Sequence, residues 1–206
     1  MLSFKTLAKI TEICDRVQLL FQEYGIKSLT MDDIADKLGC SKKTLYVFFK
    51  NRKDLVLKVI SNDMKKHELE INNVIAEKLH PIEEILNLNV IAINKLKTCH
   101  PSFQYDLKKY YPQSWNIFDK KNKQLTYKVS IQNLKKGIKK GCYRKEINPE
   151  IISKIFSEKI DLVFNRLAFE TITVSFSDVF KELINHHMLG IVNEDGRKYY
   201  LNLQKN

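Results

Sequence analysis

The chain of 206 residues is poor in the residues that interrupt helices, with six Gly and four Pro. Long stretches between these residues repeat apolar side chains at helical spacing. The four cysteines lie far apart and form no CxxC pair, so the sequence predicts neither a zinc ribbon nor a disulfide framework. His186, His187 and Glu182 supply too few ligands at suitable spacing for zinc. We therefore predict an all-α protein without a metal site.

The sequence also lacks the common signatures of membrane proteins and enzymes. No apolar run approaches the roughly 18 residues that a membrane span requires. The first ten residues place Lys5 and Lys9 among apolar ones and do not resemble a signal peptide. A Gly-rich phosphate loop, a GxSxG elbow and an HExxH pair are all absent. We expect a cytoplasmic protein that is not an enzyme, binds no cofactor and has no membrane partner.

Acidic residues are scarce in one part of the chain, and this explains most of the net charge of +11. Residues 1–60 carry eleven Lys/Arg and seven Asp/Glu, whereas residues 95–145 carry fourteen and two. The 95–145 segment is a solubilising surface in the simplest interpretation. Alternatively, it attracts an anionic effector, such as an acyl thioester or a fatty acid, or DNA that flanks an operator. A non-regulatory architectural or lipid-surface protein that uses this segment is the competing function.

The stretch from Thr30 to Arg52 is the most informative part of the chain. Thr30 and Asp33 have the spacing of a capping box, and apolar Ile34 and Leu38 then fall on one helix face. Gly39 stands where a left-handed residue ends a helix. The sequence therefore predicts a short helix followed by a sharp turn.

A second short helix is expected from Ser41, which is placed to cap it, to about Phe49. It would bury Leu45 and one or both of Phe48 and Phe49. Its exposed N-terminal side would then carry Lys42, Lys43, Thr44 and Tyr46, which are residue types that contact DNA. Two such helices across a Gly-containing turn predict a helix-turn-helix, with the second helix entering the major groove.

The residues that match a known pattern extend over roughly the first sixty positions. They are Tyr24-Gly25, Leu29-Thr30, Asp33-Ile34-Ala35, Leu38-Gly39, Ser41-Lys42, Thr44-Leu45-Tyr46, Phe49 and Lys50-Asn51-Arg52-Lys53-Asp54-Leu55. This pattern resembles the N-terminal domain of the TetR family of bacterial transcriptional repressors. The resemblance implies an all-helical homodimer with a three-helix DNA-binding domain and a larger domain for effector binding and dimerisation. It also implies repression that lasts until a small molecule binds.

We expect DNA contacts from the two caps and from the exposed residues of the motif. Phe48 stands where this family often has a His, and a Phe at that position offers only apolar contacts, for example to a thymine methyl. The predicted DNA-binding residues are Thr30, Ser41, Lys42, Lys43, Thr44, Tyr46, Phe48, Lys50 and Arg52.

The predicted domains are residues 1–50 for DNA binding and residues 51–206 for effector binding and dimerisation. A first helix is expected from about Ser3 to Tyr24. Asn51 is placed to cap a long helix that reaches His80-Pro81 and mechanically joins the two domains. Ser102 is expected to cap a short helix that ends at Tyr111.

The densest aromatic group of the chain lies between residues 103 and 118. Effector pockets are mostly apolar with a few polar groups, so these residues are candidates for lining one. Ordinary helix–helix core is the alternative interpretation. The candidate effector-binding residues are Phe103, Tyr105, Tyr110, Tyr111, Trp115 and Phe118.

Two helices with wide apolar faces are expected near the C-terminus, starting at Asn148-Pro149-Glu150 and Ser177-Asp178, with a partly mobile tail after Asn193. The TetR resemblance implies that they form a four-helix bundle with a second subunit. A two-fold dimer presents two recognition helices about 34 Å apart and so predicts a palindromic operator. The predicted interface residues are Ile152, Phe156, Val163, Phe180, Leu183, Ile184, His187, Met188 and Ile191.

Overall fold

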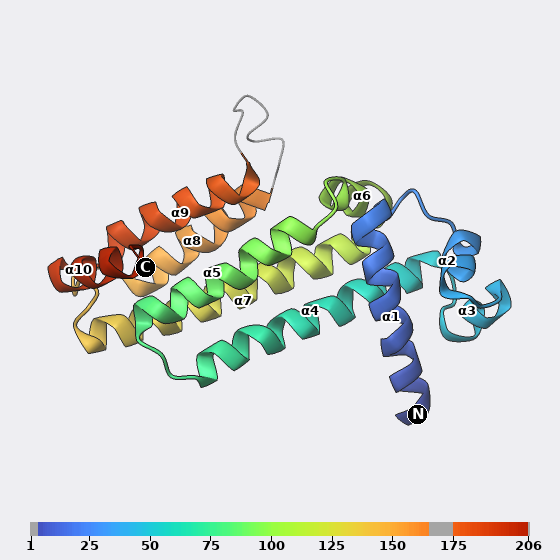
Figure 1. Ribbon diagram of the computed structural model, residues 1–206, viewed down its shortest axis with the longest axis horizontal. Coiled ribbons are helices and arrows are strands. Elements are labelled where there is room, and N and C mark those ends of the chain that lie inside the picture. The colour runs from blue at the N-terminus through green and yellow to red at the C-terminus, as the bar shows by residue number, and fades with distance from the viewer. Residues whose placement is uncertain (1–3, 165–174, 206) are drawn as a thin grey trace. The chain divides into compact units, whose positions relative to one another are not determined.

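The structure is a computed structural model that describes residues 4–164 and 175–205. Over these ranges the chain forms ten helices, which confirms the predicted all-α fold. Helices of the described part are too short or too polar to cross a membrane. The helices, labelled in Figure 1, are α1 (Phe4–Tyr24), α2 (Met31–Leu38), α3 (Lys42–Phe48), α4 (Arg52–Ala76), α5 (Pro81–Thr98), α6 (Phe103–Tyr110), α7 (Pro112–Lys140), α8 (Pro149–Phe164), α9 (Phe176–Ile191) and α10 (Glu194–Leu203).

The ends of the N-terminal helices follow their local sequence. Gly25 and Gly39 both adopt positive φ angles, of 78° and 70°, and end α1 and α2 as expected. The Asn51 side chain accepts the N–H of Asp54 at 3.0 Å, which confirms it as the cap of α4. That helix ends at Ala76, a few residues before the predicted stop at His80-Pro81.

Three expectations about helix ends were wrong. Ser102 makes no capping bond, because its hydroxyl bonds the Asp106 carboxylate at 2.8 Å. Ser175, not Ser177, caps α9 by accepting the N–H of Asp178. The tail after Asn193 forms α10, since Asn193 accepts the N–H of Gly196 and starts another helix. The Thr/Ser-rich stretch before α9, which the sequence predicts to be a loop, lies mainly outside the described residues.

The chain divides into two compact units that each combine two stretches of sequence. Unit 1 comprises residues 1–69 and 98–120, and unit 2 comprises residues 70–97 and 121–206. Unit 1 thus contains the helix-turn-helix together with α6 and the first turns of α7. The functional boundary predicted at residue 50 stays a prediction, and the units are described separately below.

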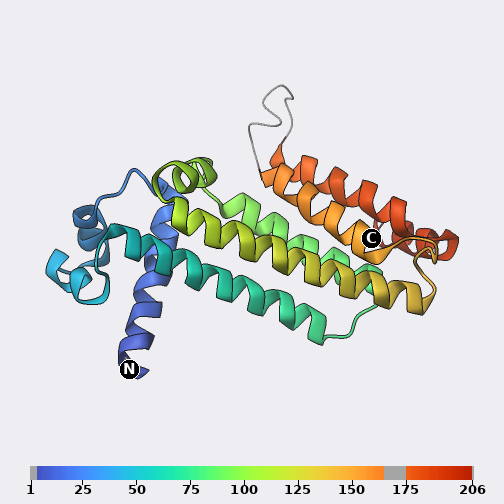
Figure 2. The same cartoon turned by 180° about the vertical axis from the view of Figure 1, so that it is seen from behind.

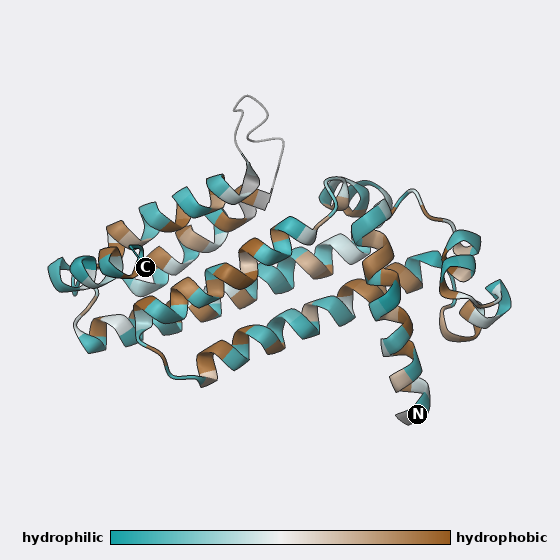
Figure 3. Ribbon diagram, in the orientation of Figure 1, coloured by the Kyte–Doolittle hydropathy of each residue, from teal (hydrophilic) through white to brown (hydrophobic). Residues whose placement is uncertain are grey.

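The core of unit 1 is built where α1 crosses α4, as both Figure 1 and Figure 2 show. Figure 3 shows apolar residues along this part of α1. Val17 and Phe21 of α1 meet Val56 and Val59 of α4, and Leu45 of α3 joins them; all five side chains are buried. Burying each such side chain contributes about 1.5–3 kcal/mol, so this cluster holds the three N-terminal helices on α4.

Unit 2 has its own apolar core and a buried polar group inside it. Helices α8 and α9 lie side by side (Figures 1 and 2) and contribute six of the fourteen buried residues of this core, which also includes Tyr200 of α10. The polar group joins α5 to α7. Asn133 donates to Glu84 at 2.9 Å and accepts from the Tyr143 hydroxyl at 2.9 Å. Lys136 bonds the other oxygen of Glu84 at 2.7 Å.

Candidate nucleic-acid interface

The start of α2 carries the predicted capping box. Asp33 N–H donates to the Thr30 hydroxyl oxygen at 3.2 Å, and Thr30 N–H donates to the Asp33 carboxylate at 2.7 Å. The bonds from the Thr30 backbone and side chain lower the pKa of Asp33, because they favour its charged form. The capping box is therefore confirmed, and it fixes where α2 begins.

The turn between α2 and α3 contains no loop. Gly39 N–H bonds the carbonyl of Asp36 and Cys40 N–H bonds that of Ala35, both at 3.0 Å, so the last carbonyls of α2 are satisfied. Ser41 then caps α3 by accepting the N–H of Thr44 at 3.0 Å. The two helices are held at a fixed angle by these local bonds and by Leu45 beneath them.

One face of α3 is open to solvent and carries the predicted DNA-contact residues. Lys42, Lys43, Thr44 and Tyr46 are all exposed, while Leu45 is fully buried. Thr30 and Ser41, which cap the two helices, are exposed as well. A short helix with cationic and hydroxyl groups at its N-terminal end, anchored from behind by Leu45, has the features of a recognition helix.

Lys42 and Lys43 differ in their surroundings. The Lys42 ammonium lies 2.8 Å from the Asp32 carboxylate, and this hydrogen bond raises the pKa of Lys42. Both side chains are at least half exposed, so the pair contributes little to stability. No carboxylate of the described residues lies within ion-pair distance of Lys43. The charge of Lys43 is therefore unpaired among the described residues, whereas that of Lys42 is paired with Asp32.

The structure places Phe48 differently from the position expected of a base-contacting residue. Phe48 is half-buried and packs against the unit 1 core next to the fully buried Phe49. Its neighbour Val47 is the apolar residue that faces outward, with 73% of its surface exposed. Sequence reasoning missed Val47, although its spacing of four from Lys43 places both on the same helix face.

Lys50 and Arg52, near the start of α4, also differ in their surroundings. Lys50 is exposed, and its backbone N–H donates to the Asp54 carboxylate at 2.9 Å. Arg52 donates through Nε to the Tyr111 hydroxyl at 2.6 Å and through Nη2 to the carbonyl of Ile26. These two bonds lie inside unit 1 and connect the turn before α2 to the end of α6.

The candidate effector residues lie in unit 1, mostly as part of its core. Tyr111 is buried and Tyr105 is exposed. Phe103, Tyr110, Trp115 and Phe118 are half-buried and pack against the core below the helix-turn-helix. This packing supports the alternative of ordinary helix–helix core, and effector binding by these residues stays a prediction.

The candidate dimer residues also divide by burial. Five of them lie in the core of the single chain: Val163, Phe180, Ile184, Met188 and Ile191. The half-buried ones are Ile152, Phe156, Leu183 and His187, and the Phe156 and His187 rings stack at 4.1 Å. On α8 the apolar residues that face solvent are Ile151, Ile155 and Leu162, at 57%, 46% and 51% exposure.

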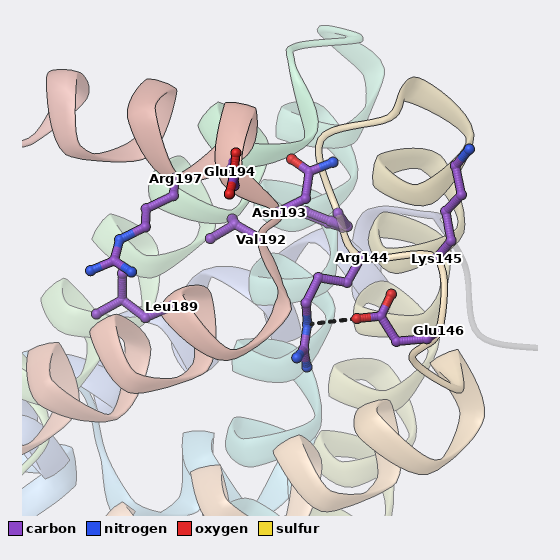
Figure 4. A pocket seen from close by; sticks show the side chains of 9 residues that line it. Arg144, Lys145, Glu146, Leu189, Val192, Asn193, Glu194 and Arg197 are labelled. Atoms are coloured by element: carbon purple, nitrogen blue, oxygen red, sulfur yellow. Dashed lines mark ion pairs between the residues drawn. The ribbon is translucent and has the colours of Figure 1, made fainter.

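A separate open cavity of about 510 Å³ lies in unit 2 (Figure 4). Its rim carries three basic and two acidic side chains, and Arg144 points to Glu146 at 3.8 Å. The lining favours no single charge of ligand. Its residues are Tyr143, Arg144, Lys145, Glu146, Leu189, Val192, Asn193, Glu194 and Arg197.

The described residues contain no cluster of three His, Cys, Asp or Glu suited to a metal, and the four cysteines are unpaired. Burial raises the pKa of the Cys14 thiol to about 11, which keeps it protonated and unreactive at neutral pH. The fold and the exposed face of α3 together define a helix-turn-helix protein of the DNA-binding class.

Comparison with known proteins gives a family match over the helix-turn-helix. Residues 19–59 match the family described as bacterial regulatory proteins, tetR family. The chain is 26% identical over 141 residues to the transcriptional regulator YvaF of Bacillus subtilis, covering 67% of this chain and 72% of that protein. It is 19% identical over 151 residues to the transcriptional repressor KstR2 of Mycobacterium tuberculosis, covering 71% and 75%.

A solved transcriptional regulator from Cytophaga hutchinsonii shares the fold, with a TM-score of 0.74 and 17% identity over 90% of this chain and 99% of that one. The resemblance drawn from the sequence is confirmed over the helix-turn-helix: residues 19–59 match the tetR family, and about two thirds of the chain is similar to a bacterial transcriptional regulator. Its relatives are named as regulators, which agrees with the prediction that it is not an enzyme.

Proposed function

We propose that the protein is a homodimeric repressor that binds a palindromic operator and is released from it by a small-molecule effector. The observation that carries this proposal is the exposed N-terminal face of α3, where Lys43, Thr44 and Tyr46 stand on a capped helix anchored by buried Leu45. Lys43 and Tyr46 supply a cation and a hydroxyl for phosphates, and Thr44 and Val47 supply short groups for base edges.

A second copy of the chain supplies the second recognition helix that a palindromic operator requires. The solvent-facing stripe of Ile151, Ile155 and Leu162 on α8 supports a dimer interface, because three large apolar residues lie exposed on one helix face. The half-buried residues Ile152, Phe156, Leu183 and His187 would extend it. Two-fold symmetry then sets the recognition helices about one DNA turn, or 34 Å, apart.

DNA binding holds the two recognition helices at the spacing of the operator. An effector that binds better to a dimer with another spacing would shift the population of dimers and release the DNA. The aromatic residues 103–118 remain our candidate for sensing the effector. Since Phe103, Tyr110, Trp115 and Phe118 pack under the helix-turn-helix, a small molecule inserted among them would move the core that supports α2 and α3. Trp115 is the single Trp, so its fluorescence reports such binding directly. KstR2 is named a repressor, which favours repression over activation here.

The test is binding to an operator selected from random duplexes by the full-length protein. Lys43→Ala with Tyr46→Ala is expected to lower operator affinity more than tenfold, while the dimer and its thermal unfolding stay unchanged. The control is Lys139→Ala with Lys140→Ala, which removes two exposed charges at the end of α7, one more than the test variant removes. Unchanged operator affinity in the Lys43/Tyr46 variant would overturn the proposed docking surface.

A further inference from the structure

A second cationic surface exists in unit 1, away from α3. Lys27 lies in the turn between α1 and α2, and Lys108 and Lys109 lie on and near the end of α6. All three side chains are exposed. We name these three lysines the α6 patch. Lys108 and Lys109 belong to the basic 95–145 segment, and they lie in unit 1 together with Lys27 and the helix-turn-helix.

The α6 patch is held rigidly against the DNA-binding motif. Lys27 N–H donates to the Asp106 carboxylate at 3.0 Å, and the Ser102 hydroxyl bonds the same oxygen at 2.8 Å. Arg52 joins the carbonyl of Ile26 to the hydroxyl of Tyr111. Figures 1 and 2 both show α6 beside the C-terminal end of α1. The turn that leads into α2 and helix α6 therefore form one continuous surface.

The charges of the α6 patch are oriented but not neutralised. The Lys27 ammonium lies 4.9 Å from the centre of the Tyr110 ring, and that of Lys108 lies 4.5 Å from the Trp115 ring. Lys109 donates to the Tyr105 hydroxyl at 2.6 Å. Among the described residues no carboxylate is within ion-pair distance of these three ammonium groups, because buried Asp106 faces Ser102 and the Lys27 backbone. Aromatic rings position a cation while leaving its charge available.

We propose that the α6 patch binds backbone phosphates of DNA next to the half-site that α3 reads. This inference rests on the proposed function and extends the DNA footprint beyond the recognition helix. Lys27 is three residues from Thr30, the exposed cap of α2, so a duplex held at α2 and α3 runs close to this turn. The exposed aromatic of the surface, Tyr105, has its hydroxyl bound to Lys109, and the patch offers no aliphatic side chain for insertion into lipid. Phosphates of DNA therefore suit it better than a membrane surface.

Phosphate contacts carry a measurable signature, since each one contributes about 0.9 to the slope of log K against log salt. The test compares the full-length protein with Lys27→Gln, Lys108→Gln and Lys109→Gln combined. Binding is measured between about 0.05 and 0.2 M salt, on the selected operator and on a 40-base-pair duplex of random sequence. We expect the slope to fall by about 2 to 3 on both duplexes, with the ratio of specific to non-specific affinity retained within about threefold.

The control variant is Lys135→Gln, Lys139→Gln and Lys140→Gln, which removes the same net charge from exposed positions of α7 in unit 2. If the two triple variants show equal slopes of log K against log salt, the α6 patch does not bind DNA phosphates, while the proposed function stays intact. Failure of the unaltered protein to select any operator would instead overturn the proposed function. Sedimentation with phosphatidylglycerol vesicles tests whether the α6 patch binds a membrane surface instead. If vesicle binding depends on the patch while the salt dependence of DNA binding is unchanged in the triple variant, the proposal is contradicted.

Discussion

The face of α3 and the polar group between α5 and α7 use similar side chains in opposite environments. On α3, Lys42 pairs with Asp32 at 2.8 Å, and both side chains are at least half exposed. In unit 2, Lys136 pairs with Glu84 at 2.7 Å, and the Glu84 side chain is 1% exposed. Water stabilises the charges of the first pair when it separates, but it does not reach Glu84. Polar residues on α3 are therefore free to serve binding, whereas those at Glu84 are committed to the fold.

The largest expected effect that tests this contrast comes from Asn133→Ala. The change leaves the buried Glu84 oxygen, the Tyr143 hydroxyl and the Pro81 carbonyl without the amide that they now share. Each unpaired buried group costs about 1–3 kcal/mol, so we expect a loss of about 3–5 kcal/mol in the free energy of unfolding. Urea denaturation followed by circular dichroism measures it. A loss below about 1 kcal/mol would show that water reaches this group and would remove the contrast with α3.

A second test concerns His187, whose ring stacks on Phe156 in unit 2. Burial lowers the pKa of His187 to about 4, and Lys159 and His186 add to the effect. In the unfolded chain a His has a pKa near 6.5, so between pH 6.5 and pH 4 the unfolded chain binds more protons than the folded one. The contribution of neutral His187 to the free energy of unfolding is therefore fully present above about pH 6.5 and is lost as the pH falls toward 4. We expect a decline on the order of 3 kcal/mol attributable to this residue.

Thermal and urea unfolding of the protein and of His187→Phe, at steps from pH 7 to pH 4, measure this decline. The substitution keeps an aromatic ring against Phe156 but removes the proton site. A flatter profile for the variant is expected. Profiles that run parallel over the whole range would exclude His187 as the source.

The smallest expected effect on stability comes from the cap of α2. Thr30→Ala removes the hydroxyl that accepts the Asp33 N–H, and N-cap losses typically cost about 1 kcal/mol. Thr30→Ser keeps the acceptor oxygen and is the matched control. Because Thr30 is also a candidate phosphate contact, we expect Thr30→Ala to lower operator affinity by more than Thr30→Ser at equal folded fraction. Equal affinities would assign Thr30 to folding alone.

Sequence reasoning succeeded where local chemistry decides the structure. The Thr30/Asp33 capping box, the Ser41 and Asn51 caps and the left-handed Gly39 follow from residues within four positions of one another. The sequence also placed the buried Leu45 and the exposed N-terminal end of α3 correctly, but not Val47 and Phe48 near the other end of this helix.

The sequence was less informative where distant contacts decide. Helices α8 and α9 carry apolar residues around much of their circumference, and only tertiary packing shows that Phe180, Ile184 and Met188 face the chain's own core. Arg52 looks like a surface cation until Tyr111, 59 residues away, is found beside it. The aromatic segment 103–118 is a further case, because it packs in the same core cluster as buried residues of α1 and α4, which are distant in sequence.

The central claim is that the N-terminal faces of two α3 helices, brought together by dimerisation, read DNA one helical turn apart. Hydroxyl-radical footprinting of the full-length protein on its selected operator tests this most directly. We predict two protected segments, related by a two-fold axis and centred about 10 base pairs apart, that both disappear with Lys43→Ala and Tyr46→Ala. A single protected segment, or one that persists in this variant, would contradict the account.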